Sequence, residues 1–94
     1  DIDGVIAGKT AENNYAKAFP IKCNIDIINK MYDKGHNVVM FTARGYVTGI
    51  DWTETTKKQL AEWGLKYTEL RFGKPAADVY IDDRFFDINV LSQL

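Results

Sequence analysis

Two acidic pairs, placed near opposite ends of the chain, carry the residue types that phosphoryl transfer uses. Asp1 and Asp3 open the sequence ahead of Gly4, and Asp82 and Asp83 follow an apolar run. Gly4 allows the chain to turn, so that the first pair converges on one substrate. Asp1 is suited to attack phosphorus as a carboxylate nucleophile. Asp3 is suited to protonate the leaving oxygen and then to deprotonate the hydrolytic water.

A phosphate dianion approaching several carboxylates is repelled unless positive charge compensates. Mg²⁺ prefers oxygen ligands, and Asp82 and Asp83 would complete its set. Thr42, which ends a β-rich run, is expected to donate a hydrogen bond to a phosphoryl oxygen. Lys74 is expected to neutralise the charge that builds up in the transition state. These groups together predict a phosphate site with a bound cation.

Further cationic and polar residues flank this set. Arg44 and Arg84 lie beside the two strand-end signals, and either is a candidate for gripping substrate phosphate or sugar. Lys9, Tyr15 and Lys17 belong to an early loop that is rich in Gly, Ala, Asn and Lys and is a candidate cover for the site.

Strands that alternate with helices are predicted to position these residues. Apolar spacings of three and four predict a helix between Pro20 and Gly35, and a second helix is expected over about 52–63. The run 37–42 is expected to be a strand buried on both faces. Further strands are expected at 67–72 and 78–82, followed by a docking segment, 85–94, of undefined form.

This alternation predicts an α/β fold with a parallel sheet and helices on both faces. The chemical signals then share the edge at the carboxyl ends of the strands, where such sheets bind ligands.

Length and composition indicate one small domain spanning 1–94. The apolar fraction is 46% and the charged fraction 27%, as in ordinary globular proteins. A net charge of −1 does not favour nucleic acid as a partner. No apolar run is long enough to span a membrane, so a cytoplasmic location is expected. Cys23 is expected to be a buried, inert thiol.

The ordered motifs resemble those of the haloacid dehalogenase-like (HAD) phosphohydrolases. The resemblance implies a Rossmann-like fold with Asp1 as nucleophile, Asp3 as acid and base, and functional roles for Thr42 and Lys74. It also implies Mg²⁺ held by Asp1, the main-chain carbonyl of Asp3, Asp82 and Asp83. The spacing leaves no room for an inserted cap domain, so the enzyme is expected to be capless. The motifs look like those of small bacterial HAD proteins of capsule or surface-polysaccharide biosynthesis.

The sequence therefore predicts an Mg²⁺-dependent phosphomonoesterase that acts through an aspartyl-phosphate on a small metabolite such as a sugar phosphate. Two alternatives stay open: a non-catalytic phosphate-binding or assembly module with the same fold, and a phosphatase of nucleic-acid ends. A homo-oligomer or a partner chain is a candidate cover for the open site. An apolar β-strand is also expected ahead of Asp1, because a catalytic carboxylate needs a buried strand behind it.

Overall fold

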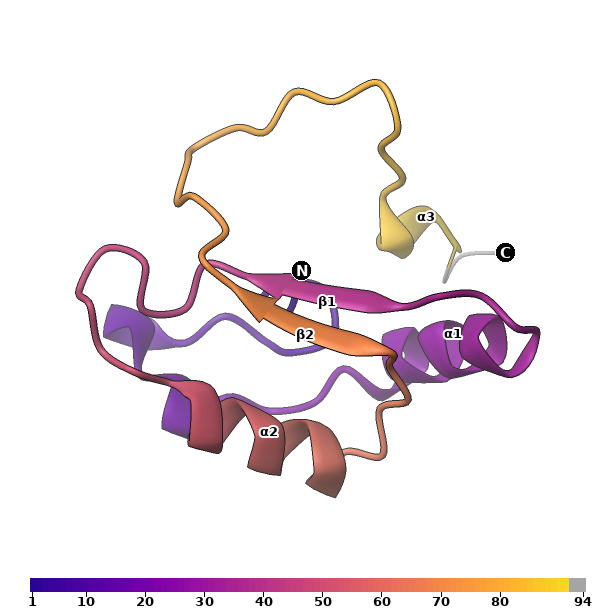
Figure 1. Cartoon of the computed structure of the whole chain (residues 1–94), viewed down its shortest axis with the longest axis horizontal. Helices are drawn as coiled ribbons and strands as arrows, with labels where there is room; N and C mark the ends of the chain where they lie inside the picture. Colours follow the sequence, from indigo (N-terminus) through magenta and orange to yellow (C-terminus); the bar gives the residue numbers. More distant parts are fainter. Residues whose placement is uncertain (92–94) are drawn as a thin grey trace.

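The computed structural model describes residues 1–91 as a small α/β unit in which two parallel strands alternate with helices (Figure 1). In chain order the elements are η1 (Ala11–Asn13), η2 (Tyr15–Lys17), α1 (Lys22–Asp33), β1 (Val39–Thr42), α2 (Thr53–Glu62), β2 (Glu69–Phe72) and α3 (Ile88–Leu91). The two strands pair in register, with Val39 opposite Glu69 and Thr42 opposite Phe72. The predicted parallel arrangement of these two strands is confirmed, and α2 makes the crossover between them.

Local signals set the ends of the two longer helices. α1 ends just before Gly35, whose φ of +94° is a conformation that glycine adopts without strain. The N–H of Gly35 donates to the carbonyl of Tyr32 and so satisfies one of the last free acceptors. At the start of α2, the Asp51 carboxylate accepts the N–H of Thr53 at 2.9 Å. Both helices lie within a residue or two of their predicted bounds.

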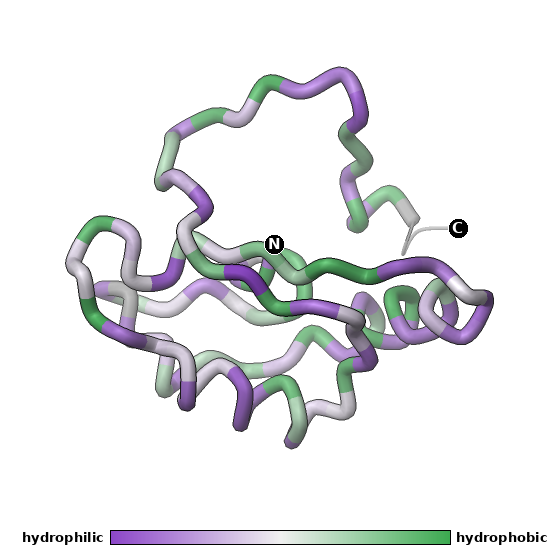
Figure 2. The backbone as a smooth tube through the Cα atoms, viewed as in Figure 1, coloured by the Kyte–Doolittle hydropathy of each residue, from purple (hydrophilic) through white to green (hydrophobic). Residues whose placement is uncertain are grey.

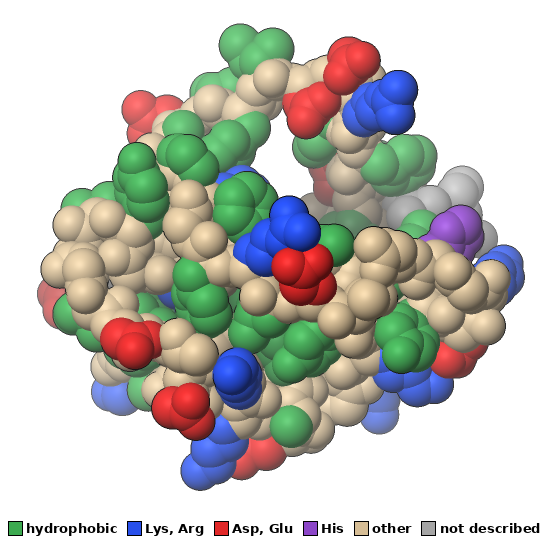
Figure 3. Space-filling view, viewed as in Figure 1, with side chains coloured by type: hydrophobic (Ala, Val, Ile, Leu, Met, Phe, Trp, Pro, Cys, Tyr) green, Lys and Arg blue, Asp and Glu red, His purple; other side chains and the backbone are tan. Residues whose placement is uncertain are grey.

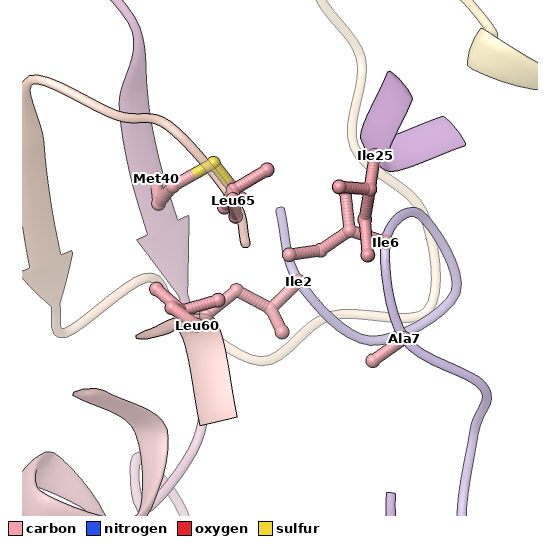
Figure 4. Packing of buried hydrophobic residues seen from close by; sticks show 7 residues of the cluster. All are labelled: Ile2, Ile6, Ala7, Ile25, Met40, Leu60 and Leu65. Carbon is pink, nitrogen blue, oxygen red and sulfur yellow. The ribbon is translucent and has the colours of Figure 1, made fainter. Parts of the chain in front are cut away.

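A single apolar cluster holds the N-terminal loop, α1, α2 and β1 together (Figure 4). Ile2 and Ile6 from the loop are fully buried, and Leu60 from α2 is buried with them. The cluster consists of Ile2, Ile6, Ala7, Ile25, Met40, Leu60 and Leu65. Because Ile2 is part of this cluster, the residues on either side of it, Asp1 and Asp3, are fixed relative to the sheet.

The sheet buries only one of its faces within the described residues. Met40 and Thr42 of β1 point into the core, whereas Val39 and Phe41 are 38% and 39% exposed. The prediction that this strand is buried on both faces is therefore wrong for the described chain. The expected layer of helices on the second face is likewise not found among residues 1–91, since α1 and α2 both contribute to the cluster that contains Met40.

The expected strand at 78–82 is not formed. Residues 73–87 trace a wide loop that leaves the end of β2 and returns at α3 (Figure 1). Val79 is 71% exposed and Ile81 is 96% exposed. A strand requires a neighbouring backbone to satisfy its N–H and C=O groups. Within residues 1–91, β1 and β2 pair only with each other, so the apolar run has no adjacent strand and forms no regular secondary structure.

The end of the described chain and Cys23 both bear on the predictions made from the sequence. The segment predicted to dock at 85–94 contains α3, whose Ile88 is buried, and its residues 92–94 lie outside the described part of the chain. Cys23 is exposed near the start of α1, so the prediction of a buried thiol is wrong. Along the backbone, β1 is among the most apolar stretches (Figure 2). No helix among the described residues combines the length and the apolar character that crossing a membrane requires.

Candidate functional site

A tight loop at the start of the chain presents Asp1 and Asp3. The carbonyl of Ile2 accepts the N–H groups of Val5, Ile6 and Ala7. The N–H of Gly4, whose φ is +87°, donates to the carbonyl of Ala7 at 2.7 Å. Ile2 points into the core, so its two acidic neighbours are left toward the surface, with Asp3 half-buried and Asp1 exposed. The turn predicted from Gly4 is confirmed.

Lys74 reaches Asp1 from the far end of β2. Its Nζ lies 3.6 Å from Oδ2 of Asp1 and 4.2 Å from the centre of the Tyr80 ring. The backbone N–H of Lys74 donates to the carbonyl of Thr42 at 3.1 Å, which ties the residue to the carboxyl end of β1. Oδ1 of Asp1 accepts the N–H of Ile2 at 2.8 Å. The structure therefore brings together the predicted nucleophile and the predicted charge-neutralising lysine.

Asp3 is held by Arg44 through two parallel hydrogen bonds. Nε of Arg44 donates to Oδ2 of Asp3, and Nη2 donates to Oδ1, both at 2.9 Å. This fork-to-carboxylate pairing is the strong bidentate form of an ion pair. The Arg44 side chain is fully buried and that of Asp3 is 21% exposed. Arg44 was predicted to bind substrate, but its guanidinium is directed at a residue of the protein.

Thr42 ends β1 as predicted and is almost fully buried. Its Oγ1 accepts the backbone N–H of Arg44 at 3.1 Å, so the hydroxyl shapes the turn that follows the strand. The same hydroxyl group can still donate its own proton in a second hydrogen bond. In this arrangement, however, Thr42 contributes to the site by fixing Arg44 rather than by lining open space.

An open cavity of about 440 Å³ lies beside Asp1 and Asp3. Its walls come from the N-terminal loop, η2, the turn after β1 and the loop after β2. The lining residues are Asp1, Asp3, Lys9, Thr10, Tyr15, Ala43, Arg44, Ala76, Ala77, Asp78 and Tyr80. The space-filling view shows an opening between the loop after β2 and the body of the molecule (Figure 3). Lys9 and Tyr15 thus lie where a cover over the site was expected, while Lys17 is exposed and does not line the cavity.

The second acidic pair is placed elsewhere. Asp82 and Asp83 are exposed on the wide loop and do not line the cavity. Oδ1 of Asp82 accepts the N–H of Arg84 at 2.9 Å, and this hydrogen bond is the main reason why the pKa of Asp82 is lowered. Arg84, the other predicted substrate-binding residue, is exposed on the same loop.

The predicted Mg²⁺ ligands do not form one cluster in this conformation. Among residues 1–91, no three carboxylate, imidazole or thiol side chains are grouped so that they could hold a metal ion. Asp3 uses both of its carboxylate oxygens to accept hydrogen bonds from Arg44, and Asp1 has Lys74 beside it. The residues as placed here do not fit Mg²⁺, because the charge of the first acidic pair is already compensated by two side-chain cations.

The sequence did not indicate the residues that support Arg44. Nη1 of Arg44 donates to Oγ1 of Thr56 at 3.0 Å and to Oε1 of Gln59 at 2.7 Å. Both partners belong to α2 and are spaced three apart, so they lie on one face of that helix. A polar residue at each of these positions within an otherwise core-facing stripe is the signal that would have found them. Tyr15 completes the surroundings, with its ring 4.8 Å from the guanidinium carbon.

Comparison with known proteins supports the fold and leaves the activity open. No protein-family model matches the chain, and no curated protein matches it. A crystal structure of a structural-genomics target from Vibrio cholerae is similar to this chain, with a TM-score of 0.88 at 22% sequence identity. The match covers 99% of this chain and 84% of that one. The two proteins therefore share a fold.

Proposed function

We propose that this protein is a HAD-like phosphomonoesterase that acts on a small phosphorylated metabolite, such as a sugar phosphate, through an aspartyl-phosphate intermediate. The observation that carries the proposal is the 3.6 Å approach of Lys74 Nζ to Asp1 Oδ2 beside an open cavity. A carboxylate with an adjacent ammonium group can attack a phosphate dianion without meeting uncompensated repulsion. The neighbouring Asp3 supplies the second carboxyl group that the reaction needs.

Two displacements at phosphorus complete the reaction. In the first, an Asp1 oxygen forms a bond to phosphorus while the bond from phosphorus to the ester oxygen breaks. The leaving alkoxide takes the proton that Asp3 carries in its carboxylic acid form, which leaves Asp3 as the carboxylate that Arg44 holds. Lys74 stabilises negative charge on the phosphoryl oxygens. In the second, Asp3 accepts a proton from water as that water attacks phosphorus. The bond from phosphorus to Asp1 breaks, which releases inorganic phosphate and regenerates the carboxylate.

The position of the cavity in the fold also supports the proposal. Parallel α/β sheets bind ligands outside the carboxyl ends of their strands. Thr42 ends β1, and Lys74 follows β2 by two residues. We infer a Rossmann-like, capless HAD arrangement from this position and from the motif order. Because the walls of the cavity come from loops, a turn and the short helix η2, substrates of varied shape would reach Asp1.

Mg²⁺ belongs to this proposal as a requirement of the HAD resemblance, and it would supply a Lewis acid for the phosphoryl oxygens. In the structure described here, Asp82 and Asp83 lie outside the cavity, and the first acidic pair is compensated by Lys74 and Arg44. The two displacements are therefore assigned to protein side chains alone. A metal requirement would mean that the loop carrying Asp82 and Asp83 moves toward Asp1.

Phosphate release from a panel of sugar phosphates, nucleotides and 5′- or 3′-phosphorylated oligonucleotides tests the activity. We expect release from small monoesters. Loss of release after exhaustive chelation, with its return on adding Mg²⁺, would show that the loop carrying Asp82 and Asp83 moves toward Asp1. Asp1→Asn should abolish release, and Lys58→Gln on the exposed side of α2 serves as the matched surface control. Phosphate binding without turnover would instead identify a phosphate-binding module. Selective turnover of the oligonucleotides would identify a nucleic-acid-end phosphatase.

A further inference from the structure

The buried position of Arg44 is unusual for a residue next to an open phosphate site. Its side chain is fully buried, although Arg44 is among the residues that line the cavity. Arginine carries a permanent charge and is costly to bury without partners. A substrate-binding arginine needs N–H donors that face the ligand. The N–H donors of Arg44 instead face acceptors within the protein, beginning with Asp3.

Four hydrogen bonds and one aromatic ring surround the guanidinium. Asp3 accepts from Nε and Nη2, while Thr56 and Gln59 both accept from Nη1. The Tyr15 ring packs over the guanidinium carbon at 4.8 Å, within the range of a cation–π contact. Four of the five N–H donors of the group are thus directed at acceptors within the protein.

Gln59 links this arrangement to the loop that borders the cavity. Its Oε1 accepts from Arg44 at 2.7 Å, and its Nε2 donates to the carbonyl of Tyr15 at 2.6 Å. One side-chain amide therefore joins α2, η2 and the turn after β1. Tyr15 is further fixed by an edge-on contact with Trp52, with ring centres 5.1 Å apart.

We propose that Arg44 is a positioning residue, which sets the orientation of the Asp3 carboxylate and is itself held in place by Thr56 and Gln59 of α2. This inference rests on the proposed phosphomonoesterase function. Bidentate pairing fixes both the distance and the plane of the Asp3 carboxylate, which a single contact would leave free to rotate. The rotation of α2 about its axis then determines where the acid–base group points.

Arg44→Lys tests the geometry separately from the charge. Lysine keeps the positive charge but offers a point donor in place of the planar fork. We expect kcat to fall on the order of 10²-fold, as misplacement of a reacting group by about 1 Å does. KM should stay unchanged, because Arg44 is not expected to touch the substrate. Gln59→Met should lower kcat in the same direction, and the two changes combined should be less than additive.

Lys58→Gln is the matched control, because Lys58 lies next to Gln59 in sequence on α2 and is 78% exposed. Its kcat and KM should match those of the unchanged protein. A rise in KM with an unchanged kcat in Arg44→Lys would show that Arg44 binds substrate, and would overturn the proposal. Unchanged values of both constants would overturn it equally.

Side-chain ¹³C NMR of the aspartates provides a readout that does not depend on turnover. In Arg44→Lys, the carboxyl resonance of Asp3 should move, while those of Asp26 and Asp87, which are remote in sequence from the site, should not. Loss of native spectral dispersion in Arg44→Lys would direct the measurement to Gln59→Met. This variant keeps the Arg44 side chain but removes one of its two acceptors on α2, so the Asp3 resonance should move there as well. If neither variant moves the Asp3 resonance, Arg44 does not position Asp3. If the unchanged protein releases no phosphate but the resonance moves, the phosphomonoesterase proposal fails and the positioning role stands.

Discussion

Lys74 Nζ lies 3.6 Å from Asp1 Oδ2, although the two residues are 73 positions apart in the chain. The contact forms because Lys74 follows β2 while its backbone N–H is bonded to the last residue of β1. Two side chains that carry opposite charges are thereby placed at one edge of the sheet. Four predictions depend on this edge and on the elements around it.

Removing the ammonium group at Lys74 should slow turnover without unfolding the protein. We expect Lys74→Met to lower kcat by roughly 10²–10³-fold, the cost typical of losing one group that stabilises transition-state charge. Lys66→Met removes an exposed lysine that pairs with Asp33 and should leave kcat unchanged. Steady-state kinetics on a shared monoester substrate measures both. Equal kcat values for the two variants would contradict the role assigned to Lys74.

Loss of the second carboxyl group should slow both displacements. In Asp3→Asn the amide can neither protonate the leaving oxygen nor accept a proton from water. We expect kcat to fall by roughly 10²–10⁴-fold. With an activated ester, whose leaving group needs no proton, the phosphorylated protein should accumulate and be seen by intact-mass spectrometry. The unmodified mass throughout the time course would argue against Asp3 as the base in the second step.

Tyr15 should make the folded state sensitive to alkaline pH. Burial raises the pKa of Tyr15 above its ordinary value of 10.0, and the nearby Asp3 carboxylate raises it further. The unfolded chain then loses its tyrosine proton at a lower pH than the folded protein does. Stability is fully present below about pH 10 and declines as pH rises from there toward the raised pKa.

Tyr15→Phe should therefore reduce the fall in melting temperature between about pH 9 and about pH 11. Tyr46→Phe is the control, because Tyr46 is 52% exposed outside the network. Thermal unfolding followed by circular dichroism at matched ionic strength gives the comparison. Identical pH dependence in Tyr15→Phe and in the unchanged protein would show that Tyr15 does not couple ionisation to folding.

The edge of β1 away from β2 should accept a further apolar strand. Within residues 1–91, β1 pairs only with β2, so no strand lies along its other edge. Val39 and Phe41 are more than a third exposed, and the apolar run around Ile81 forms no regular secondary structure. A five-residue Val- and Ile-rich extension ahead of Asp1 should pair with β1 and give residues 79–82 a partner. Each large apolar side chain that becomes buried would add about 1.5–3 kcal/mol.

The measurement is the free energy of unfolding, together with amide hydrogen exchange over 79–82. A Gly-Ser extension of equal length is the control, since it cannot bury apolar surface. We expect a higher free energy of unfolding and slower exchange only with the apolar extension. If both extensions behave alike, the exposed apolar residues do not form a strand-accepting edge.

The sequence by itself determined the two longer helices, α1 and α2, the two paired strands and the loop that presents Asp1 and Asp3. These features depend on local signals: Gly35 stops α1, Asp51 precedes α2, and Gly4 allows the turn between the acidic loop and Ala7. The meeting of Asp1 with Lys74 also followed, because the carboxyl ends of parallel strands share one edge.

Only the tertiary structure decided the role of Arg44, since its partners Thr56 and Gln59 depend on how α2 is rotated against the sheet. The same holds for the run around Ile81, whose β-propensity is expressed only where a neighbouring backbone offers hydrogen bonds. Hydrogen bonding between distant segments depends on their relative placement, and neither residue type nor spacing along the chain specifies that placement.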